Sequence, residues 1–189
     1  FAERALLDRY LAAVQQVVNR HDILRTAFLW QELSVPVQVV WRQASLSVLE
    51  LNLDPADGPV HEQLARRFNP RHYRLDLSQP PLLRFVVAQE EDGRWIVLQL
   101  LHHLIGDHTT MDIMHREVQA CLNGQEASLP VPVPFRNSVA QARLGISEAG
   151  HIRFFSKMLG DVEEPTLPFG LTEVHRDGSQ VTDFHQMLP

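Results

Sequence analysis

The sequence has 189 residues, of which 17 are Lys or Arg, 23 are Asp or Glu and 44% are hydrophobic. This length suits one globular domain or one lobe of a larger domain. The formal net charge of −6 and the lack of a Lys/Arg run argue against nucleic acid and an anionic membrane surface as partners. The single cysteine cannot form an internal disulfide, the first residues show no signal-peptide pattern, and no apolar run reaches the roughly 20 residues of a membrane span. The sequence therefore predicts a cytoplasmic protein.

The first third of the chain is predicted to contain two helices separated by strands. Apolar residues recur with a 3.6-residue period between Glu3 and His21, which predicts an amphipathic helix. A second helix is predicted over Gly58–Asn69, where Pro70 ends it. Between them, β-rich stretches predict three short strands: Leu24–Gln31, Val35–Trp41 and Leu46–Leu51.

A β-hairpin followed by a helix is predicted in the middle of the chain. Leu82–Gln89 and Arg94–Leu101 flank a turn in which Gly93 takes the position that needs a positive φ. The second arm is almost entirely apolar, which predicts a central strand covered on both faces. Helical spacing of apolar residues resumes over Thr109–Leu122. Such a corner between strand and helix is where open α/β structures place chemistry.

The last third changes in composition. Two weaker helices are predicted over Phe135–Leu144 and Ser147–Gly160, with Ser147 as a helix N-cap. Residues 161–189 are rich in Pro, Gly, Thr and Glu without periodicity, and end in a β-like stretch at Val181–Leu188. We interpret residues 161–189 as a crossover toward a partner lobe.

The densest set of chemically useful side chains lies at the predicted strand end. His102 and His103 supply imidazoles that can accept a proton near neutral pH, and Asp107 supplies a carboxylate that can fix local geometry by pairing with a cation. A buried guanidinium at Arg25 would need a carboxylate, and Asp107 is the candidate. The alternative is that the two histidines are surface or capping residues. Arg20, next to His21 at a helix end, is explained by its favourable interaction with the helix dipole.

A metal site is a competing interpretation of the same region. His108, Asp112 and His115 follow an i, i+4, i+7 pattern, and with His103 they would supply four ligands of the type that Zn²⁺ accepts. The His-Glu-x-x-His arrangement of a helical zinc site is missing, however. We therefore expect no bound metal.

Three segments together resemble the condensation domain of nonribosomal peptide synthetases, in the chloramphenicol-acetyltransferase-like superfamily. Residues 102–107, His-His-Leu-Ile-Gly-Asp, match the family's His-His-x-x-x-Asp-Gly motif. Residues 20–28 are similar to its Arg-His-Glu-x-Leu-Arg-Thr-x-Phe motif, and residues 73–84 resemble its Phe-Asp-Leu-x-x-x-Pro-Leu-Leu-Arg segment. The resemblance spans roughly residues 6–160.

The resemblance implies an α/β fold, an α+β two-layer sandwich with a mixed, largely antiparallel sheet covered by helices. It implies that residues 1–160 are the N-terminal lobe and that residues 161–189 lead to a C-terminal lobe absent from this chain. Carried over to this sequence, it makes His103 the catalytic base or positioning group, His102 its neighbour in the motif, and Asp107 a structural residue paired with Arg25.

The reaction implied by the resemblance is peptide-bond formation between aminoacyl or peptidyl thioesters. Donor and acceptor carrier proteins would deliver these on 4'-phosphopantetheine, so that this chain binds no cofactor directly, and neighbouring synthetase domains would be further partners. One departure is His108, which stands where the motif has Gly. An epimerisation or ester-forming domain and a noncatalytic carrier-docking domain are the alternatives, and we expect the chain alone to be inactive.

Overall fold

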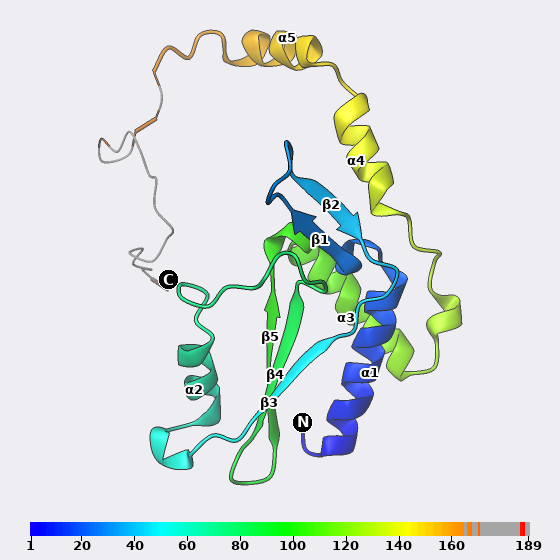
Figure 1. Cartoon of the computed structure of the whole chain (residues 1–189). Coiled ribbons are helices and arrows are strands. Elements are labelled where there is room, and N and C mark those ends of the chain that lie inside the picture. Colours follow the sequence, from blue (N-terminus) through cyan, green and yellow to red (C-terminus); the bar gives the residue numbers. More distant parts are fainter. Residues whose placement is uncertain (165, 168–169, 171–185, 188–189) are drawn as a thin grey trace.

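The computed structural model describes residues 1–164, 166–167, 170 and 186–187 (Figure 1). Within the described residues, the helices and strands that the sequence predicts up to residue 160 are present, with ends that shift by a few residues. The helices are α1 (Arg4–Arg20), α2 (Val60–Arg67), α3 (His108–Leu122), α4 (Phe135–Leu144) and α5 (Glu148–Leu159). The strands are β1 (Thr26–Leu29), β2 (Val37–Val40), β3 (Ser47–Leu51), β4 (Leu83–Gln89) and β5 (Trp95–Leu101). Short 3₁₀ helices include η1 (Ile23–Arg25) and η3 (His103–Ile105).

The strands form two small sheets. In the three-stranded sheet β4 lies in the middle, parallel to β3 and antiparallel to β5, and β1 pairs with β2 in a separate antiparallel ribbon. Gly93 in the β4–β5 turn has a φ of 85°, as predicted, a backbone conformation that glycine adopts without strain. The mixed, largely antiparallel α/β architecture expected from the sequence is therefore confirmed.

The prediction that β5 is a central strand is wrong for the part of the chain that is described. Its residues are all half-buried and it lies at the edge of the sheet, whereas Phe85 and Val86 of β4 are fully buried. The prediction failed because helices cover both faces of β5, which makes its sequence apolar although only one strand flanks it. Val97 packs with one hydrophobic cluster and Leu98 with the other. An apolar run reports covered faces, and it carries no information on how many strands flank it.

Residues on the two faces of β4 belong to two different hydrophobic cores. On one face, Leu83 and Phe85 of β4 pack with the buried sides of α1 and α3. On the other face, Val86 and Ala88 pack with α2, which lies across the sheet from α1 and α3 (Figure 1). Helix α2 thus adds a third layer to the two expected. The strand period of two places successive residues of β4 on opposite faces, which explains this division.

Helices α4 and α5 lead away from this body (Figure 1). They bury no residue, and α5 begins with the predicted cap, in which the Ser147 hydroxyl accepts from the backbone N–H of Gly150 at 3.2 Å. The β-like stretch predicted at Val181–Leu188, and most of the predicted crossover at 161–189, lie outside the described residues. Within the ranges that the structure describes, no helix is long and apolar enough to span a bilayer.

Candidate active site at the end of strand β5

The two motif histidines lie directly after β5. The backbone N–H of His102 donates to the carbonyl of Leu82 at 3.0 Å, which fixes this end of β5 to β4. His103 begins η3, whose last residue Ile105 is buried in the larger core. His103 is therefore held between a strand and the start of α3, as predicted, while its own side chain is exposed.

His102 is oriented by its own turn. Its Nδ1 accepts from the backbone N–H of Leu104 at 3.1 Å, so the proton of the neutral ring resides on Nε2. Burial lowers the pKa of His102 below its ordinary value, and the neighbouring charge of His103 lowers it further. His102 thus caps η3 as a neutral ring and leaves His103 as the imidazole that faces solvent.

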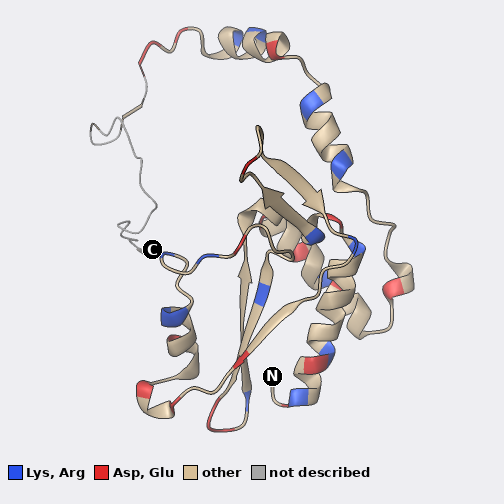
Figure 2. Cartoon of the chain, viewed as in Figure 1, with Lys and Arg blue, Asp and Glu red and all other residues tan. Residues whose placement is uncertain are grey.

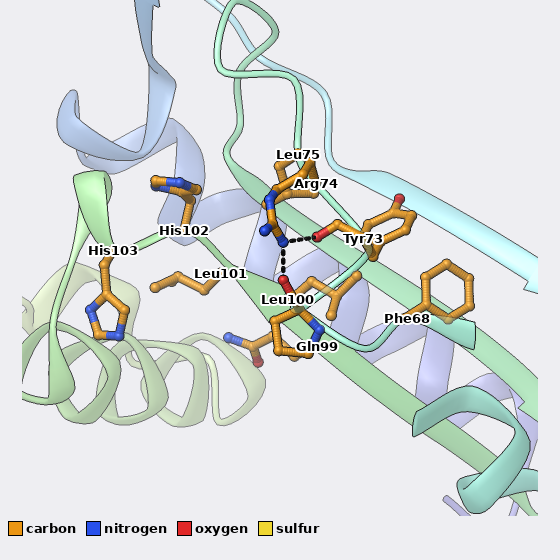
Figure 3. Close-up of a pocket in the computed structure, with 10 residues that line it drawn as sticks. Phe68, Tyr73, Arg74, Leu75, Gln99, Leu100, Leu101, His102 and His103 are labelled. Atoms are coloured by element: carbon orange, nitrogen blue, oxygen red, sulfur yellow. Dashed lines mark hydrogen bonds between the residues drawn. The ribbon is translucent and has the colours of Figure 1, made fainter. Parts of the chain in front are cut away.

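His103 borders two hollows, one on each side of the strand end. Each has a volume of about 450 Å³. Gln99, Leu101 and His103 line both. The first hollow continues over Phe68, Pro70, Tyr73, Arg74, Leu75, Leu100 and His102 (Figure 3). The second continues over Asp107, His108, Met111 and His115 of the α3 region. Of the three motif residues His102, His103 and Asp107, His103 is therefore the one that both hollows share.

Part of the rim of the first hollow is formed by residues 73–75, the start of the 73–84 segment that resembles the condensation domain family. Arg74 donates to the backbone carbonyls of Pro70 and Tyr73 (Figure 3). The Tyr73 hydroxyl accepts from Arg84 of β4, and the Tyr73 ring packs edge-on against Phe68 with centroids 5.0 Å apart. These contacts hold the rim against the sheet before any ligand binds.

Asp107 is the N-cap of α3. Its Oδ1 accepts from the backbone N–H of Thr110 at 2.9 Å and from the Thr110 hydroxyl at 3.1 Å. These two hydrogen bonds, the backbone one first, lower the pKa of Asp107 below its ordinary value. A capping carboxylate satisfies N–H groups that the first helical turn leaves without partners.

The predicted ion pair between Asp107 and Arg25 is not among the ion pairs of the described residues. Arg25 instead donates to the carbonyls of Trp41 and Arg42, just after β2, the latter at 3.1 Å. Its Nε has no hydrogen-bond partner within the described ranges. The prediction assumed that a guanidinium in this place needs a carboxylate, but backbone carbonyls accept from it, and Asp107 is satisfied by its own helix.

The capping role of Asp107 yields a test by double-mutant cycle. We expect Asp107→Ala to lower the melting temperature and Asp107→Asn, which still accepts from Thr110, to lower it less. The stability effects of Asp107→Ala and Thr110→Val should be coupled, whereas those of Asp107→Ala and Arg25→Leu should add. Thermal unfolding of the single and double variants measures both. If the effect of Asp107→Ala were coupled to that of Arg25→Leu and not to that of Thr110→Val, the result would support the ion pair with Arg25.

Gly106 is required by the close approach of this same cap. A Cβ at residue 106 would lie 2.7 Å from Thr110 Cγ2 and 2.9 Å from Thr110 Cβ. We expect Gly106→Ala to cost about 1–3 kcal/mol in the free energy of unfolding, because Thr110 must move away from Asp107. Adding Thr110→Ala, which removes Cγ2, should recover part of that loss in denaturant unfolding. An unchanged stability of Gly106→Ala would show that the turn has room for a side chain.

The residues weighed as metal ligands are only loosely arranged. His108 Nε2 lies 3.7 Å from Asp112 Oδ2, and the His108 side chain is 92% exposed. Over the described part of the chain, no three His, Cys, Asp or Glu residues are grouped so as to hold a metal ion. His108, at the position of the motif glycine, and His115 contribute instead to the wall of the second hollow.

A buried charge cluster behind the site was missed in the sequence. Glu117 of α3 is 7% exposed, and its Oε2 accepts from Arg20 Nε at 3.0 Å and contacts His21 Nε2 at 2.8 Å. Burial acts to raise the pKa of Glu117, but the bonds to His21 and Arg20 outweigh it and lower that pKa below the ordinary value. The helix dipole alone therefore does not account for the two basic residues. An acidic residue on the apolar stripe of α3, between Met114 and Val118, was the available signal.

The same segment at the end of α1 also holds the chain that leads to α4. Both carboxylate oxygens of Asp22 accept from the backbone N–H of Phe135 at 3.0 Å. Arg20 donates a further bond to the carbonyl of Pro130 at 2.8 Å. Residues 20–22 thus fix α3 and the 130–135 segment to α1, which places the second motif behind the site as a scaffold.

The sequence is similar to segments of known synthetases. The sequence is 58% identical over all of its 189 residues to malpinin synthetase of Mortierella alpina, and covers 2% of that protein. It is 56% identical to malpibaldin synthetase of the same organism, again over its whole length, and covers 3% of that protein. To a linear gramicidin synthase polypeptide from Brevibacillus parabrevis it is 29% identical over 83% of the chain and 2% of the relative. The chain thus spans a small fraction of these relatives.

Two solved structures share the fold. One is the epimerization domain from the third module of tyrocidine synthetase B, with a TM-score of 0.66, 20% identity, and coverage of 86% of this chain and 39% of that one. The other is a cyclization-docking bidomain from Sorangium cellulosum, with a TM-score of 0.64, 23% identity, and coverage of 85% and 33%. A sequence model described as Condensation domain matches residues 4–148, which include all three motifs. The chain therefore belongs to the condensation domain family of nonribosomal peptide synthetases.

Proposed function

We propose that residues 1–160 form one lobe of a domain that joins two carrier-bound acyl groups through an amide bond. The observation that carries this proposal is the position of His103, an exposed imidazole at a rigid strand end with a hollow of about 450 Å³ on either side. A reaction between two tethered substrates needs two approaches to one group.

In the proposed reaction the α-amine of the acceptor attacks the thioester carbonyl carbon of the donor. The C–N bond forms, the C–S bond breaks, and the thiol of the donor's 4'-phosphopantetheine arm leaves. The neutral amine is the nucleophile, and a part of an amine with a pKa of about 8 is in this form at neutral pH. His103 takes the one proton that the nitrogen loses on forming the amide and returns it to the departing sulfur, so that protons balance and the imidazole is neutral again. Because thioesters are already activated, much of the acceleration would come from holding both substrates together.

Helix α5 supports the proposal that further polypeptide completes the site. Its large apolar side chains are all exposed: Ile152, Phe154, Phe155, Met158 and Leu159. An apolar stripe of this size is typical of a surface that another element covers. Helices α4 and α5 also carry basic residues: Arg136 and Arg143 on α4, and Arg153 and Lys157 on α5 (Figure 2). We infer that a second lobe, reached through residues 161–189, packs here, and that the chain alone supplies one wall and is inactive.

The proposal is tested by the product that forms on the acceptor carrier. The longest polypeptide that contains this sequence is mixed with donor and acceptor carrier proteins, each loaded with an aminoacyl thioester. Mass spectrometry of the acceptor carrier should show the added donor residue, with an amide bond and unchanged chirality. An inverted α-carbon without transfer would indicate epimerisation, an ester product from a hydroxyacyl acceptor alone would indicate an ester-forming domain, and carrier binding without turnover would indicate docking. Each of these three outcomes contradicts amide formation.

A further inference from the structure

Helices α4 and α5 form an arm, residues 135–159, that has few attachments to the rest of the molecule (Figure 1). Neither helix buries a residue. Among the hydrogen bonds and ion pairs between described residues, only the backbone N–H of Phe135, donated to the carboxylate of Asp22, joins the arm to the body. Because packing fixes so little, the direction of the arm must be set where it leaves the body.

The segment that precedes the arm is short and stiff. Residues 130–134 read Pro-Val-Pro-Val-Pro, and each proline ring locks φ. Its two valines are exposed: Val131 and Val133. The segment is held at its ends, since Arg20 donates to the carbonyl of Pro130 at 2.8 Å and Asp22 accepts from Phe135 at 3.0 Å. A stiff segment that is fixed at both ends passes one direction on to α4.

The two anchoring side chains are themselves firmly held. Nε of Arg20 donates at 3.0 Å to Glu117 of α3, whose side chain is buried. The carbonyl of Asp22 accepts at 3.0 Å from the hydroxyl of Thr26, which is buried at the start of β1. Neither anchor can turn without breaking a bond to the core elements, so the direction of the arm is tied to α3 and β1.

Asp22 acts on helix α4 itself. The N-cap position of α4 is Pro134, which offers no side-chain acceptor to the N–H groups of the first turn. The carboxylate of Asp22 takes over that role from a distant part of the chain, and a negative charge at a helix N-terminus is favourable. The bond therefore holds the end of the helix axis, where a pivot has the largest effect on the direction of the arm.

We propose that Arg20 and Asp22 form a joint that aims the α4–α5 arm, and through it sets where the second lobe stands relative to His103. Helix α3 begins beside the site and carries Glu117 of the joint, so one rigid element connects the two. That a second lobe is attached to the arm rests on the proposed function. The fixed direction of the arm rests on these contacts alone and is tested without substrate.

The test measures the distance between two spin labels by pulsed electron–electron double resonance. In the full chain, with Cys121→Ala to remove the native thiol, the labels are attached at Gln16→Cys of α1 and Ala140→Cys of α4, which are exposed positions. The unaltered joint should give one narrow distance distribution. Asp22→Ala should widen it about twofold or more, because α4 then pivots at the end of the stiff segment. Asp22→Asn keeps an acceptor oxygen and should widen it less.

Removing the donor in place of the acceptor gives an independent variant. Phe135→Pro has no N–H, and proline is favoured at the first position of a helix, so α4 is preserved. This variant should widen the distribution as Asp22→Ala does, and the two changes together should widen it no further. Phe135→Ala keeps the N–H and loses only the ring, and it should remain as narrow as the unaltered joint.

Asp8→Ala is the matched control, since Asp8 is an aspartate of α1 whose partner is Arg4, and it should leave the distribution unchanged. Circular dichroism verifies folding, and Phe135→Pro, which replaces no core residue, serves if Asp22→Ala unfolds. The inference is overturned if the unaltered joint is as broad as Asp22→Ala, if Asp22→Ala stays narrow, or if Phe135→Ala is as broad as Phe135→Pro. Amide formation plays no part in these measurements, so their failure is distinct from failure of the proposed function.

Discussion

Replacing His103 by alanine is expected to slow amide formation by about 10²–10⁴-fold, the usual contribution of a positioned acid or base. His103 is the exposed imidazole that both hollows share, and its backbone is fixed between β5 and the buried Ile105. The change removes the proton acceptor without reaching the core, so stability should be unaffected. Single-turnover transfer between loaded carriers measures the effect, in the longest polypeptide that contains this chain.

His115 provides the matched control for that variant. It is an exposed histidine of α3 that lines the second hollow, at a greater distance along the helix from the strand end. His115→Ala should keep a rate within a few-fold of the wild type. Equal losses for His103→Ala and His115→Ala would place the chemistry elsewhere in the second hollow. If His103→Ala reacted at the wild-type rate, His103 would not act as a proton acceptor, and holding the two substrates together would account for the catalysis.

The largest effect on stability is expected from Glu117→Leu, which should lower the free energy of unfolding by about 3 kcal/mol. The variant leaves Arg20 and His21 facing an apolar side chain with no carboxylate. Both basic side chains are 22% exposed, so water partly replaces the lost partner and the loss falls at the lower end of the range for a broken buried pair. Denaturant unfolding gives the value. The control is Glu62→Ala, which removes an exposed partner of Arg66 at 3.8 Å and should change stability by no more than about 0.5 kcal/mol.

The Glu117 cluster also predicts a pH dependence. The folded pKa of Glu117 is lower than its ordinary value of 4.5, so the unfolded chain binds the proton more tightly. The contribution to stability is therefore complete above pH 4.5 and is lost as the pH falls through the lower folded pKa. The difference in unfolding free energy between the wild type and Glu117→Gln should shrink over that acidic interval. A difference that is constant from neutral to acidic pH would show that the charge of Glu117 does not stabilise the fold.

Local pattern was sufficient to predict most elements and the position of the site. The 3.6-residue period of α1 and α3 arises from burying one face of each helix, and the apolar run of β5 arises from covering both faces of the sheet. Both patterns are visible in one sequence. The turn glycine at 93 and the cap at Ser147 are equally local. His103 was predicted at a strand end because the apolar run stops at Leu101, where the chain turns into η3.

Long-range partners could not be predicted in the same way. Arg25 and Asp107 were expected to pair because Asp107 was the unpaired carboxylate in the sequence, but Arg25 donates to backbone carbonyls and Asp107 accepts from the first turn of α3. A hydrogen bond to a backbone group cannot be predicted from the types of the side chains, because every residue has a backbone carbonyl. Glu117 was missed because its partners lie 96 and 97 residues away. The edge position of β5 was hidden because covered faces and flanking strands produce the same apolar run.

The most direct test of the account is whether a donor acyl group crosses to an acceptor amine at His103. The wild-type polypeptide and the His103→Ala variant are given the same pair of loaded carriers, and the amide-linked product on the acceptor carrier is followed in one turnover. The account predicts amide product from the wild type and at least about a hundredfold slower formation by the variant. A wild type that leaves both carriers unchanged, or a variant that forms the amide as fast as the wild type, would contradict it.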